Sequence, residues 1–389
     1  MQEITTEVLN QKDFLKLSKW DSLNESNFPF QRFDFHRSLI DSESIHLNTG
    51  QELLVIIAKL GDQFIGALPC YIKFHSYGEY LFDWQWANHF QMNKIPYYPK
   101  LVAYNPFTPI IGPKFLIPKS ELKKNGVSEV RIRESLIKGF CQLAIRENCF
   151  SASFLFPTPD EAIFMEQQEI APVKKRINYQ YNWTNRNYQE FDDFLSDLRK
   201  NKRKNIKKER ISIQEQNISI RIIPTNELQN YANKFYPFYL STVDKKYAHA
   251  YLTEAFFEKL FKSMPEQILL FEAKKEDKIV AMSLSLKNQE EVFGRYWGCL
   301  AEYKNLHFEL CYYQNVEYAI KNKLKRVQAG AQGTHKIPRG FLPEEVCSFH
   351  YFIHPQINSS IQNYIMEENQ HMKSLKEELD TMSPFKNKA

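Results

Sequence analysis

The sequence is poor in glycine and has no cysteine pattern that would build a metal site. Only 12 of its 389 residues are glycine. Six cysteines are scattered along it, at Cys70, Cys141, Cys149, Cys299, Cys311 and Cys347. They form neither a Cys-x-x-Cys pair nor a Cys/His spacing suited to zinc, so we expect free thiols in a reducing compartment and no bound metal.

Long apolar runs are absent as well. No stretch of about 18 uncharged apolar residues occurs, and the first residues, MQEITTEVLN, lack a basic segment followed by an apolar one. We therefore expect a cytoplasmic protein without a membrane span. The net charge of +5 is modest for this length and does not by itself indicate a nucleic-acid partner. With 43% hydrophobic residues, the chain is long enough for two globular domains.

A pattern repeats along the chain at a constant offset of 215 residues. The segment LLVIIAKLGDQFIGALP begins at Leu53, and its counterpart ILLFEAKKEDKIVAMSL begins at Ile268. Each consists of an apolar strand, a polar turn and a second strand, which predicts a β-hairpin. A tryptophan-bearing strand is expected after each hairpin, YLFDWQW at 80–86 and VFGRYWG at 292–298. A period this long indicates duplicated domains rather than a solenoid, although two hairpins can resemble each other by chance.

Helix and strand patterns follow both hairpins. In the second half, Asn305 is expected to cap a helix over about 306–325, after which RVQAGAQG has the pattern of a strand. In the first half a helix over 127–147 precedes an apolar strand, SASFLF at 151–156. This order resembles the GNAT fold. The expected fold class is α/β, with two tandem GNAT-like domains whose mixed, mostly antiparallel sheets are flanked by helices.

The boundary between the two expected domains lies near a run of basic residues. We assign the N-terminal domain to 1–185 and the C-terminal domain to 186–389. The run RKNKRKNIKKER over 199–210 holds eight Lys and Arg in twelve residues, opposed only by Glu209. The apolar residues around it recur at helical spacing, which predicts an amphipathic helix over 189–212 with a cationic face.

That cationic face has two interpretations. It can hold a phosphate-bearing carrier such as tRNA, another RNA or an anionic lipid surface, by neutralising phosphate charge. It can equally be a solvated helix surface. The residues that would make such contacts are Lys202, Arg203 and Lys207.

Glycine is concentrated late in the chain, where the expected chemistry also lies. Five glycines fall within 294–340: Gly294, Gly298, Gly330, Gly333 and Gly340. The segment GAQGTHKIPRG adds His335, Lys336 and Arg339 to that flexible backbone. Backbone N–H groups and cations can converge there on an anion, either a phosphate or a developing oxyanion. The alternative is a turn with a purely structural role.

The strand FGRYWG corresponds to the GNAT strand whose backbone holds the pantetheine arm of the acyl donor. Gly294 and Gly298 would permit a bulge or a close backbone approach in it. The loop that follows, CLAEYKNLH, lacks the glycine-rich pyrophosphate cradle of that family, so coenzyme A is one donor among others. Candidate donor-binding residues are Arg295, Tyr296, Trp297, Gly298, Gly330, Gln332 and Gly333.

The helix after this strand carries candidate general bases. A carboxylate that faces a core has a raised pKa and can take the proton of an attacking amine. Glu309, near the strand end, ranks first. Glu317 is second, because Lys321 lies four residues on and can pair with it. His307, on another side of the helix, is third.

The first half offers a candidate acceptor site. HSYGEYLFDWQWAN combines carboxylates with tryptophans, among them Asp83 and Trp84, and such side chains can grip an amine or a sugar-like ring. Tryptophans in a strand equally serve core or interface packing. The predicted acceptor-binding or anion-binding set therefore contains Asp83 and Trp84 together with His335, Lys336 and Arg339.

Several long motifs together resemble one family over nearly the whole chain. They are YGEYLFDWQWAN, YYPKLVAYNPFTPIIGP, FGRYWGC, LHFELCYYQNVEYAI, and QAGAQGTHKIPRGFLP with the following SFHYFIHP. They are similar to the FemAB-like family of peptidoglycan biosynthesis or recognition proteins, within the GNAT superfamily.

The resemblance implies an N-acyltransferase that moves an acyl or aminoacyl group onto an amine acceptor, such as a small molecule or a cell-wall precursor. The implied donor is acyl-CoA or, alternatively, aminoacyl-tRNA. The long coiled-coil arm of several Fem transferases is missing, because the strand ISIRII follows the basic helix directly. The rival interpretation is a non-catalytic protein that binds a cell-wall precursor, RNA or another anionic polymer.

Overall fold

The computed structural model describes residues 3–120, 122, 126–245, 249–353 and 355–386. The chain divides into two compact units, each of which contains a segment from the far end of the chain. The first comprises Met1–Asn178 with Val346–Lys373, and the second comprises Tyr179–Glu345 with Ser374–Ala389. The sequence predicts a single domain boundary near residue 185. In the structure, Val346–Lys373 instead belongs to the first unit.

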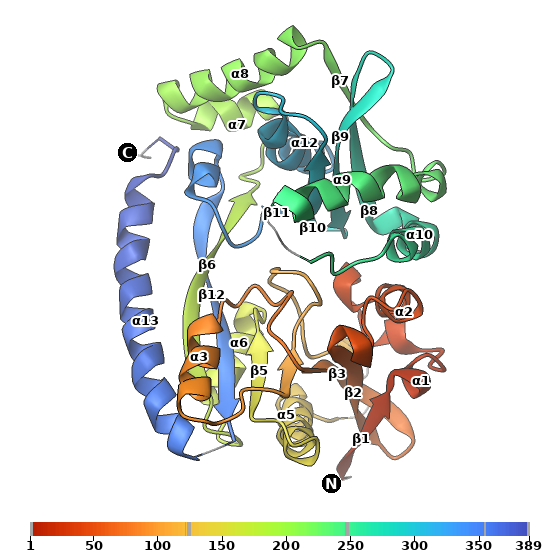
Figure 1. The fold of residues 1–389 in the computed structure, drawn as a ribbon, viewed down its shortest axis with the longest axis vertical. Coiled ribbons are helices and arrows are strands. Elements are labelled where there is room, and N and C mark those ends of the chain that lie inside the picture. Colours follow the sequence, from red (N-terminus) through yellow and green to blue (C-terminus); the bar gives the residue numbers. More distant parts are fainter. Residues whose placement is uncertain (1–2, 121, 123–125, 246–248, 354, 387–389) are drawn as a thin grey trace. The chain divides into compact units, whose positions relative to one another are not determined.

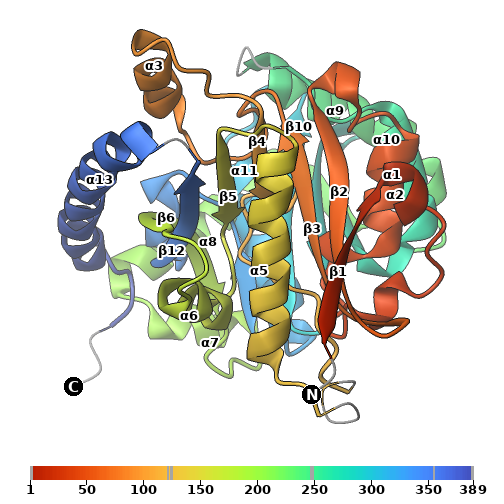
Figure 2. The ribbon, with the colours of Figure 1, turned by 90° about the horizontal axis from the view of Figure 1, so that it is seen from below.

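The first unit has a mixed sheet, seen with its helices in Figure 2. Its strand order is β1-β2-β3-β4-β5-β12. All its recorded neighbours are antiparallel except β4 and β5, which are parallel. The strands are β1 (Ile4–Asn10), β2 (Gln51–Leu60), β3 (Gln63–Lys73), β4 (Lys100–Ala103), β5 (Ser151–Leu155) and β12 (Leu342–Phe352), whose last residues pair with β5.

Helices cover this sheet, and α5 lies along it (Figure 2). Ser128 caps α5 by accepting a hydrogen bond from the Arg131 N–H, and Ile132, Leu136 and Phe140 lie on its buried face. The helices of this unit are α1 (Gln11–Phe14), α2 (Phe33–Asp41), α3 (Trp84–Met92), α5 (Glu129–Arg146), α6 (Pro159–Gln167) and the first part of α13 (Pro355–Thr381).

The second unit has the strand order β7-β8-β9-β10-β11-β6. Again all recorded neighbours are antiparallel except one pair, β10 and β11. The strands are β7 (Ile218–Ile222), β8 (Ile268–Lys275), β9 (Lys278–Lys287), β10 (Glu291–Cys299), β11 (Arg326–Gln328) and β6 (Lys174–Thr184). The two units therefore share one strand topology, in which four antiparallel strands are followed by a parallel neighbour and a final antiparallel strand.

The helices of the second unit include α9 and α12, which both pack on its sheet (Figure 1). A π-helical turn over Glu309–Tyr313 joins α11 to α12. The helices are α7 (Phe191–Asp197), α8 (Lys200–Glu215), α9 (Ala232–Lys245), α10 (Glu254–Ser263), α11 (Leu306–Phe308) and α12 (Gln314–Lys321), with a 3₁₀ segment over Thr334–Arg339.

The two predicted hairpins are confirmed, and they share an irregularity. In β2–β3 the register shifts by one residue after Ala58, and in β8–β9 it shifts after Ala273. The residues left out of register, Ile65 and Val280, are also 215 positions apart. A β-bulge at the same place in both hairpins matches the sequence repeat residue for residue.

The tryptophan strand predicted at 80–86 is wrong. Tyr80 and Phe82 have positive φ angles of 59° and 57°, which an extended strand does not allow, and α3 begins at Trp84. The position beside the hairpin is taken by β4, as β10 takes it in the second unit. The similarity between the two tryptophan motifs therefore has no structural counterpart.

Three other predicted elements need correction. The basic helix over 189–212 is two helices, because Leu198 is extended (ψ 151°) between α7 and α8. Asn305 occupies the expected N-cap position, but its backbone is left-handed (φ 63°) and its side chain makes no capping hydrogen bond. The helix ends at Lys321 rather than 325. The strand predicted from RVQAGAQG has only three residues, since positive φ at Gly330 and Gly333 turns the chain away.

Candidate functional site

Strand β10 carries the bulge that its glycines lead one to expect. Its register against β9 shifts between Gly294 and Tyr296, so Arg295 is the extra residue. Pairing with β11 extends only from Glu291 to Phe293. The strand therefore continues beyond its parallel neighbour with an altered backbone direction, at the place where the sequence predicts donor binding.

Gly298 provides the predicted close backbone approach. A Cβ added to it would lie 1.7 Å from the carbonyl oxygen of Phe238 in α9, so only glycine allows this helix to pack here. The Thr242 hydroxyl donates to the Trp297 carbonyl at 2.6 Å, and the Cys299 N–H donates to the Ser241 hydroxyl at 3.2 Å. Helix α9 thus already engages backbone groups at the end of β10.

Glu309 begins the π-helical turn and is 3% exposed. The Arg210 guanidinium of α8 holds both of its oxygens, with Nε 3.2 Å from Oε2 and Nη2 3.0 Å from Oε1. The Gln314 amide donates to Oε1 at 2.8 Å. Burial raises the pKa of Glu309, and the charge of Arg210 opposes that shift. Both carboxylate oxygens of Glu309 are therefore occupied by hydrogen bonds within the protein.

Glu317 lies on the same helix and is exposed. Its ion pair is with Arg210, at 2.7 Å, whereas the sequence suggests Lys321. One guanidinium thus bridges Glu309 and Glu317, because the π-helical turn changes the angular relation between the two carboxylates.

A second arginine connects the glycine-rich segment to α8. Arg339 donates from Nη2 and Nε to the two oxygens of Glu209, at 2.6 and 3.0 Å. Its guanidinium lies 3.4 Å from the centroid of the Phe308 ring, and Nη1 donates to the His335 carbonyl at 2.5 Å. The Tyr313 hydroxyl also donates to Glu209. These contacts therefore direct Glu209, the one acidic residue of the basic run over 199–210, toward the interior of the unit.

Lys336 is buried within the segment that carries it. Its ammonium donates to the carbonyls of Ala329 and Gly330, at 2.7 and 3.2 Å. The chain turns here, with positive φ angles of 77° at Gly330 and 104° at Gly333. Gln332, between them, is exposed. Lys336 therefore stabilises the turn through backbone carbonyls.

Two imidazoles meet beside Trp297. The ring of His307 lies 4.6 Å from that of Trp297 and 6.2 Å from that of His335, measured between centroids. His335 Nε2 is 3.0 Å from the Tyr312 hydroxyl. Partial shielding from water by the neighbouring rings, with the positive charges of Lys336 and Arg339, lowers the pKa of His335. Since His335 is exposed and His307 half-buried, these titratable groups can meet a substrate.

In the first unit, Asp83 is part of a buried ionic network rather than a surface site. Its Oδ2 accepts hydrogen bonds from Lys100 at 2.6 Å, Tyr97 at 2.6 Å and Ser76 at 3.0 Å. Lys100 also pairs with Glu79 at 2.8 Å. Trp84, the next residue, is 46% exposed. The two predicted acceptor residues thus face different environments.

Helix α8 carries the three predicted anion-binding cations Lys202, Arg203 and Lys207. Lys207 is exposed and pairs with Asp192 at 3.3 Å, and Lys202 and Arg203 are half-buried. Arg210 of this helix is hydrogen-bonded to the π-helical turn, and Glu209 to the 3₁₀ segment. The sequence analysis missed both in their inward roles, although the lone acid in a basic run was a visible signal.

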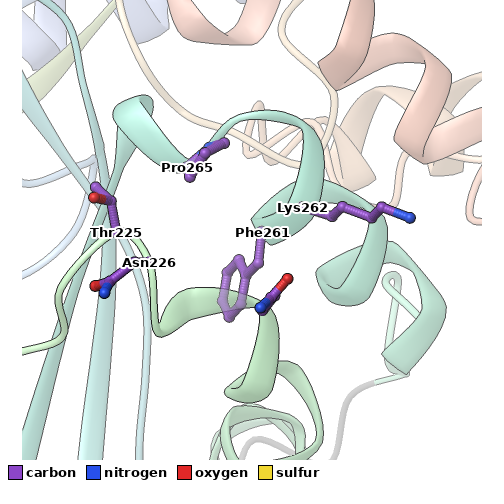
Figure 3. A pocket seen from close by; sticks show the side chains of 6 residues that line it. Thr225, Asn226, Phe261, Lys262 and Pro265 are labelled. Carbon is purple, nitrogen blue, oxygen red and sulfur yellow. The ribbon is translucent and has the colours of Figure 1, made fainter.

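Other features offer less chemistry. A pocket of the second unit is lined by Thr225, Asn226, Gln229, Phe261, Lys262 and Pro265, and Figure 3 shows Lys262 extending away from Thr225. No group of three or more potential metal ligands is found within the described residues. His354, which precedes Pro355 in the motif SFHYFIHP, lies outside the described residues. Among the described helices none is long and apolar enough to cross a bilayer.

Comparison with solved structures shows that this fold has been seen before. The C-terminal domain of a protein named for lysylphosphatidylglycerol synthesis, from Agrobacterium fabrum, aligns with a TM-score of 0.53 at 7% identity, covering 90% of this chain and 97% of that one. FemX aligns with a TM-score of 0.48 at 10% identity, covering 82% and 92% of the two chains. A tandem GNAT protein from the clavulanic acid biosynthesis pathway aligns with a TM-score of 0.45 at 11% identity, covering 91% of this chain and 99% of that one.

The class defined by fold and site is an α/β protein with mixed sheets and a polar, imidazole-bearing cluster at the end of a bulged strand. Its sequence matches the FemAB-like family, described as peptidoglycan biosynthesis/recognition, over residues 13–387. The chain belongs to this family. No curated protein matches it.

Proposed function

We propose that this protein is an N-acyltransferase, built from two GNAT-like halves, that transfers an acyl or aminoacyl group to an amine linked to cell-wall synthesis. The reaction is assigned to the second unit. The observation that carries the proposal is the bulge of β10 at Arg295 next to the imidazole pair of His307 and His335. Membership of the FemAB-like family supports the reaction class.

In the proposed reaction the amine nitrogen attacks the donor carbonyl carbon and forms the new C–N bond. The bond from that carbon to the thioester sulfur or ester oxygen breaks. The amine proton passes to one of the imidazoles and then to the leaving sulfur or oxygen. The lowered pKa of His335 favours this role, because its ring stays neutral near pH 7.

The bulge gives the donor carbonyl a place to bind. It re-aims the backbone at Arg295, and N–H groups there are the proposed hydrogen-bond donors to the developing oxyanion. Trp297 and Gly298 shape the strand end against α9, and Gly330, Gln332 and Gly333 shape the facing turn. We accordingly assign donor binding to the end of β10 together with this turn.

Geometry favours the imidazoles over Glu309 as the base, although the sequence ranks Glu309 first. Both oxygens of Glu309 accept hydrogen bonds from Arg210, and the side chain is buried. We assign Glu309 and Glu317 the role of fixing Arg210, and through it α8, against the π-helical turn. Arg339 and Lys336 hold the turn that carries His335. Asp83 positions the loop before Trp84, which remains the proposed acceptor contact.

The donor is tested by offering acyl-CoA and aminoacyl-tRNA separately with a panel of amines, and detecting the amide product by mass spectrometry. A bound donor at a hundredfold excess over its dissociation constant should add about 2.7 kcal/mol to stability. The double variant His307→Ala, His335→Ala should lose turnover, while the control His89→Ala, in α3 of the first unit, should keep it.

The rival function, a non-catalytic polymer-binding protein, is favoured by the exposed cations of α8. It predicts binding that weakens steeply with salt and no amide product from any donor. A donor-dependent product would exclude it. Absence of product with every donor, together with salt-sensitive binding of RNA, would overturn the transferase proposal.

A further inference from the structure

Exposed apolar side chains are concentrated in one segment of the first unit. Between residues 74 and 92, five large apolar side chains are exposed: Phe74, Tyr77, Phe82, Trp84 and Met92. We call this set the 74–92 patch. No other stretch of that length within the described residues holds more than two such side chains. Such a concentration of exposed apolar side chains along one segment is a sign of an interaction surface.

The segment exposes no carboxylate. Its only acidic residues, Glu79 and Asp83, are each 1% exposed and pair with the buried Lys100. The basic side chains that the segment leaves at least partly exposed are His75 and His89, and the exposed Lys94 follows it. A surface that is apolar, aromatic and without exposed negative charge is suited to the headgroup region of a bilayer.

The patch is held rigidly from beneath. Lys100 binds Ser76, Glu79 and Asp83 at 2.6–2.8 Å, which fixes the loop between β3 and α3. Gly78 has a φ of 77°, and Tyr80 and Phe82 are also left-handed. Backbone strain of this kind persists where the surroundings over-determine it, often at functional sites. The loop is therefore built to present its aromatic side chains outward.

Helix α3 has two faces. Trp86 and Phe90 pack with Phe352, Ile361 and Ile365 in a small core of the first unit. Trp84, Asn88 and Met92 follow at intervals of four residues on the other side, and Met92 is 83% exposed. Figure 2 shows α3 at the edge of its unit, beyond the ends of β4 and β5. The exposed face of α3 thus carries Trp84 and Met92 among polar side chains, namely Gln85, Asn88, His89 and Gln91. A tryptophan and a methionine on the solvent-facing side of an anchored helix are available to an outside partner.

We infer that the 74–92 patch docks the protein on a lipid bilayer, by inserting its aromatic and methionine side chains into the interfacial region. Phe74, Phe82 and Met92 carry no polar atom in their side chains, so a hydrated glycan would gain little from them. A stable dimer needs about 20–30 residues a side, whereas the patch offers one loop and one helix of nine residues. Interfacial tryptophan and tyrosine prefer the headgroup level.

The test is co-sedimentation with phosphatidylcholine vesicles, with and without phosphatidylglycerol, together with tryptophan fluorescence. The wild-type protein should sediment, and Trp84 emission should shift to the blue. The patch variant Phe74→Ser, Trp84→Ser, Met92→Ser should lower the lipid partition coefficient by about tenfold or more. The matched control Leu47→Ser, Ile145→Ser, Ile163→Ser removes three similarly exposed side chains of the same unit and should bind as wild type.

Three results would overturn this inference. Absence of sedimentation with both vesicle types excludes the bilayer as partner. Equal binding by the patch variant and wild type places the contact elsewhere, with the cations of α8 as the next candidate. A lipid-free dimer that the patch variant dissociates assigns the surface to a second copy of the chain. Turnover with soluble substrates should be unchanged in Phe74→Ser, Met92→Ser, which keeps Trp84, so this outcome is independent of the transferase assay.

Discussion

The Arg210 guanidinium grips the buried carboxylate of Glu309 at two points, with Nε 3.2 Å from Oε2 and Nη2 3.0 Å from Oε1. Removing one partner of a buried pair leaves the other charge uncompensated. We therefore expect Arg210→Ala to lower the free energy of unfolding by about 2–4 kcal/mol. Urea unfolding at neutral pH measures this free energy. The control Arg146→Ala, at an exposed position, should change it little.

The double variant Arg210→Ala, Glu309→Gln sharpens that test. Without the carboxylate, the loss of Arg210 should cost less, so the two substitutions should couple favourably. The raised pKa of Glu309 also predicts the direction in which stability changes with pH. In Arg210→Ala the folded state holds this proton more tightly than the unfolded state, so stability should fall as pH rises through the folded pKa. A loss in the double variant equal to the sum of the two single losses would contradict the pairing.

Gly298→Ala should destabilise the second unit. Its new Cβ would lie 1.7 Å from the Phe238 carbonyl oxygen, and backbone cannot rotate out of the way. We expect a loss of about 2–4 kcal/mol in thermal unfolding. Gly294→Ala is the matched control on the same strand, since its Cβ would meet the Gln328 carbonyl only at 3.4 Å. Equal tolerance of both substitutions would show that α9 does not pack as described.

His335 should titrate below the ordinary range of histidine. Burial and the charges of Lys336 and Arg339 lower its pKa, and Arg339→Gln should raise it toward the usual value. Because the unfolded state then binds more protons, the contribution of His335 to stability is complete above its unfolded pKa and is lost on acidification. NMR titration of the ring protons measures the shift, and Arg146→Gln should leave it unchanged.

The same titration should appear in the rate. If His335 accepts the amine proton, the acid limb of the pH–rate profile should lie below the ordinary histidine pKa and move upward in Arg339→Gln. An acid limb at the ordinary histidine pKa that does not move in Arg339→Gln would remove His335 from the proposed proton path.

Lys73 should make stability depend on alkaline pH. It is fully buried, and burial lowers its pKa to about 8, partly opposed by Glu79. The unfolded state holds this proton up to about pH 10.4, so the free energy of unfolding should rise by about 2–3 kcal/mol between pH 8 and that value. Lys73→Met should remove this increment. Comparison of urea midpoints across the window measures it, with Lys138→Met as the control on an exposed position.

Local patterns were readable from the sequence because they depend on neighbours in the chain. The apolar alternation of the two hairpins, the helix over Glu129–Arg146 and the strand at Ser151 all follow from such spacing. The repeat of 215 residues extended even to the shared bulge after Ala58 and Ala273. Gly294 and Gly298 likewise pointed to a bulge and a close approach in β10.

Other features depended on contacts between distant residues, which spacing does not encode. YLFDWQW has the composition of a strand, yet the ionic network of Lys100 with Glu79 and Asp83 imposes a loop and a helix. The π-helical turn at Glu309 brings that carboxylate and Glu317 to the same arginine. That arginine is 99 positions away from Glu309, so no local pattern indicated it.

The sequence by itself determined the family, the hairpin repeat and the region where the candidate chemistry lies, since these rest on motifs and on short-range periodicity. The tertiary structure alone decided which titratable groups remain accessible. Long-range ion pairs commit Glu309 and Arg339 to contacts inside the protein, and Lys336 is held by carbonyls of its own turn. His307 and His335 stay accessible beside β10. Burial and distant ion pairs, which only a folded chain creates, made that selection.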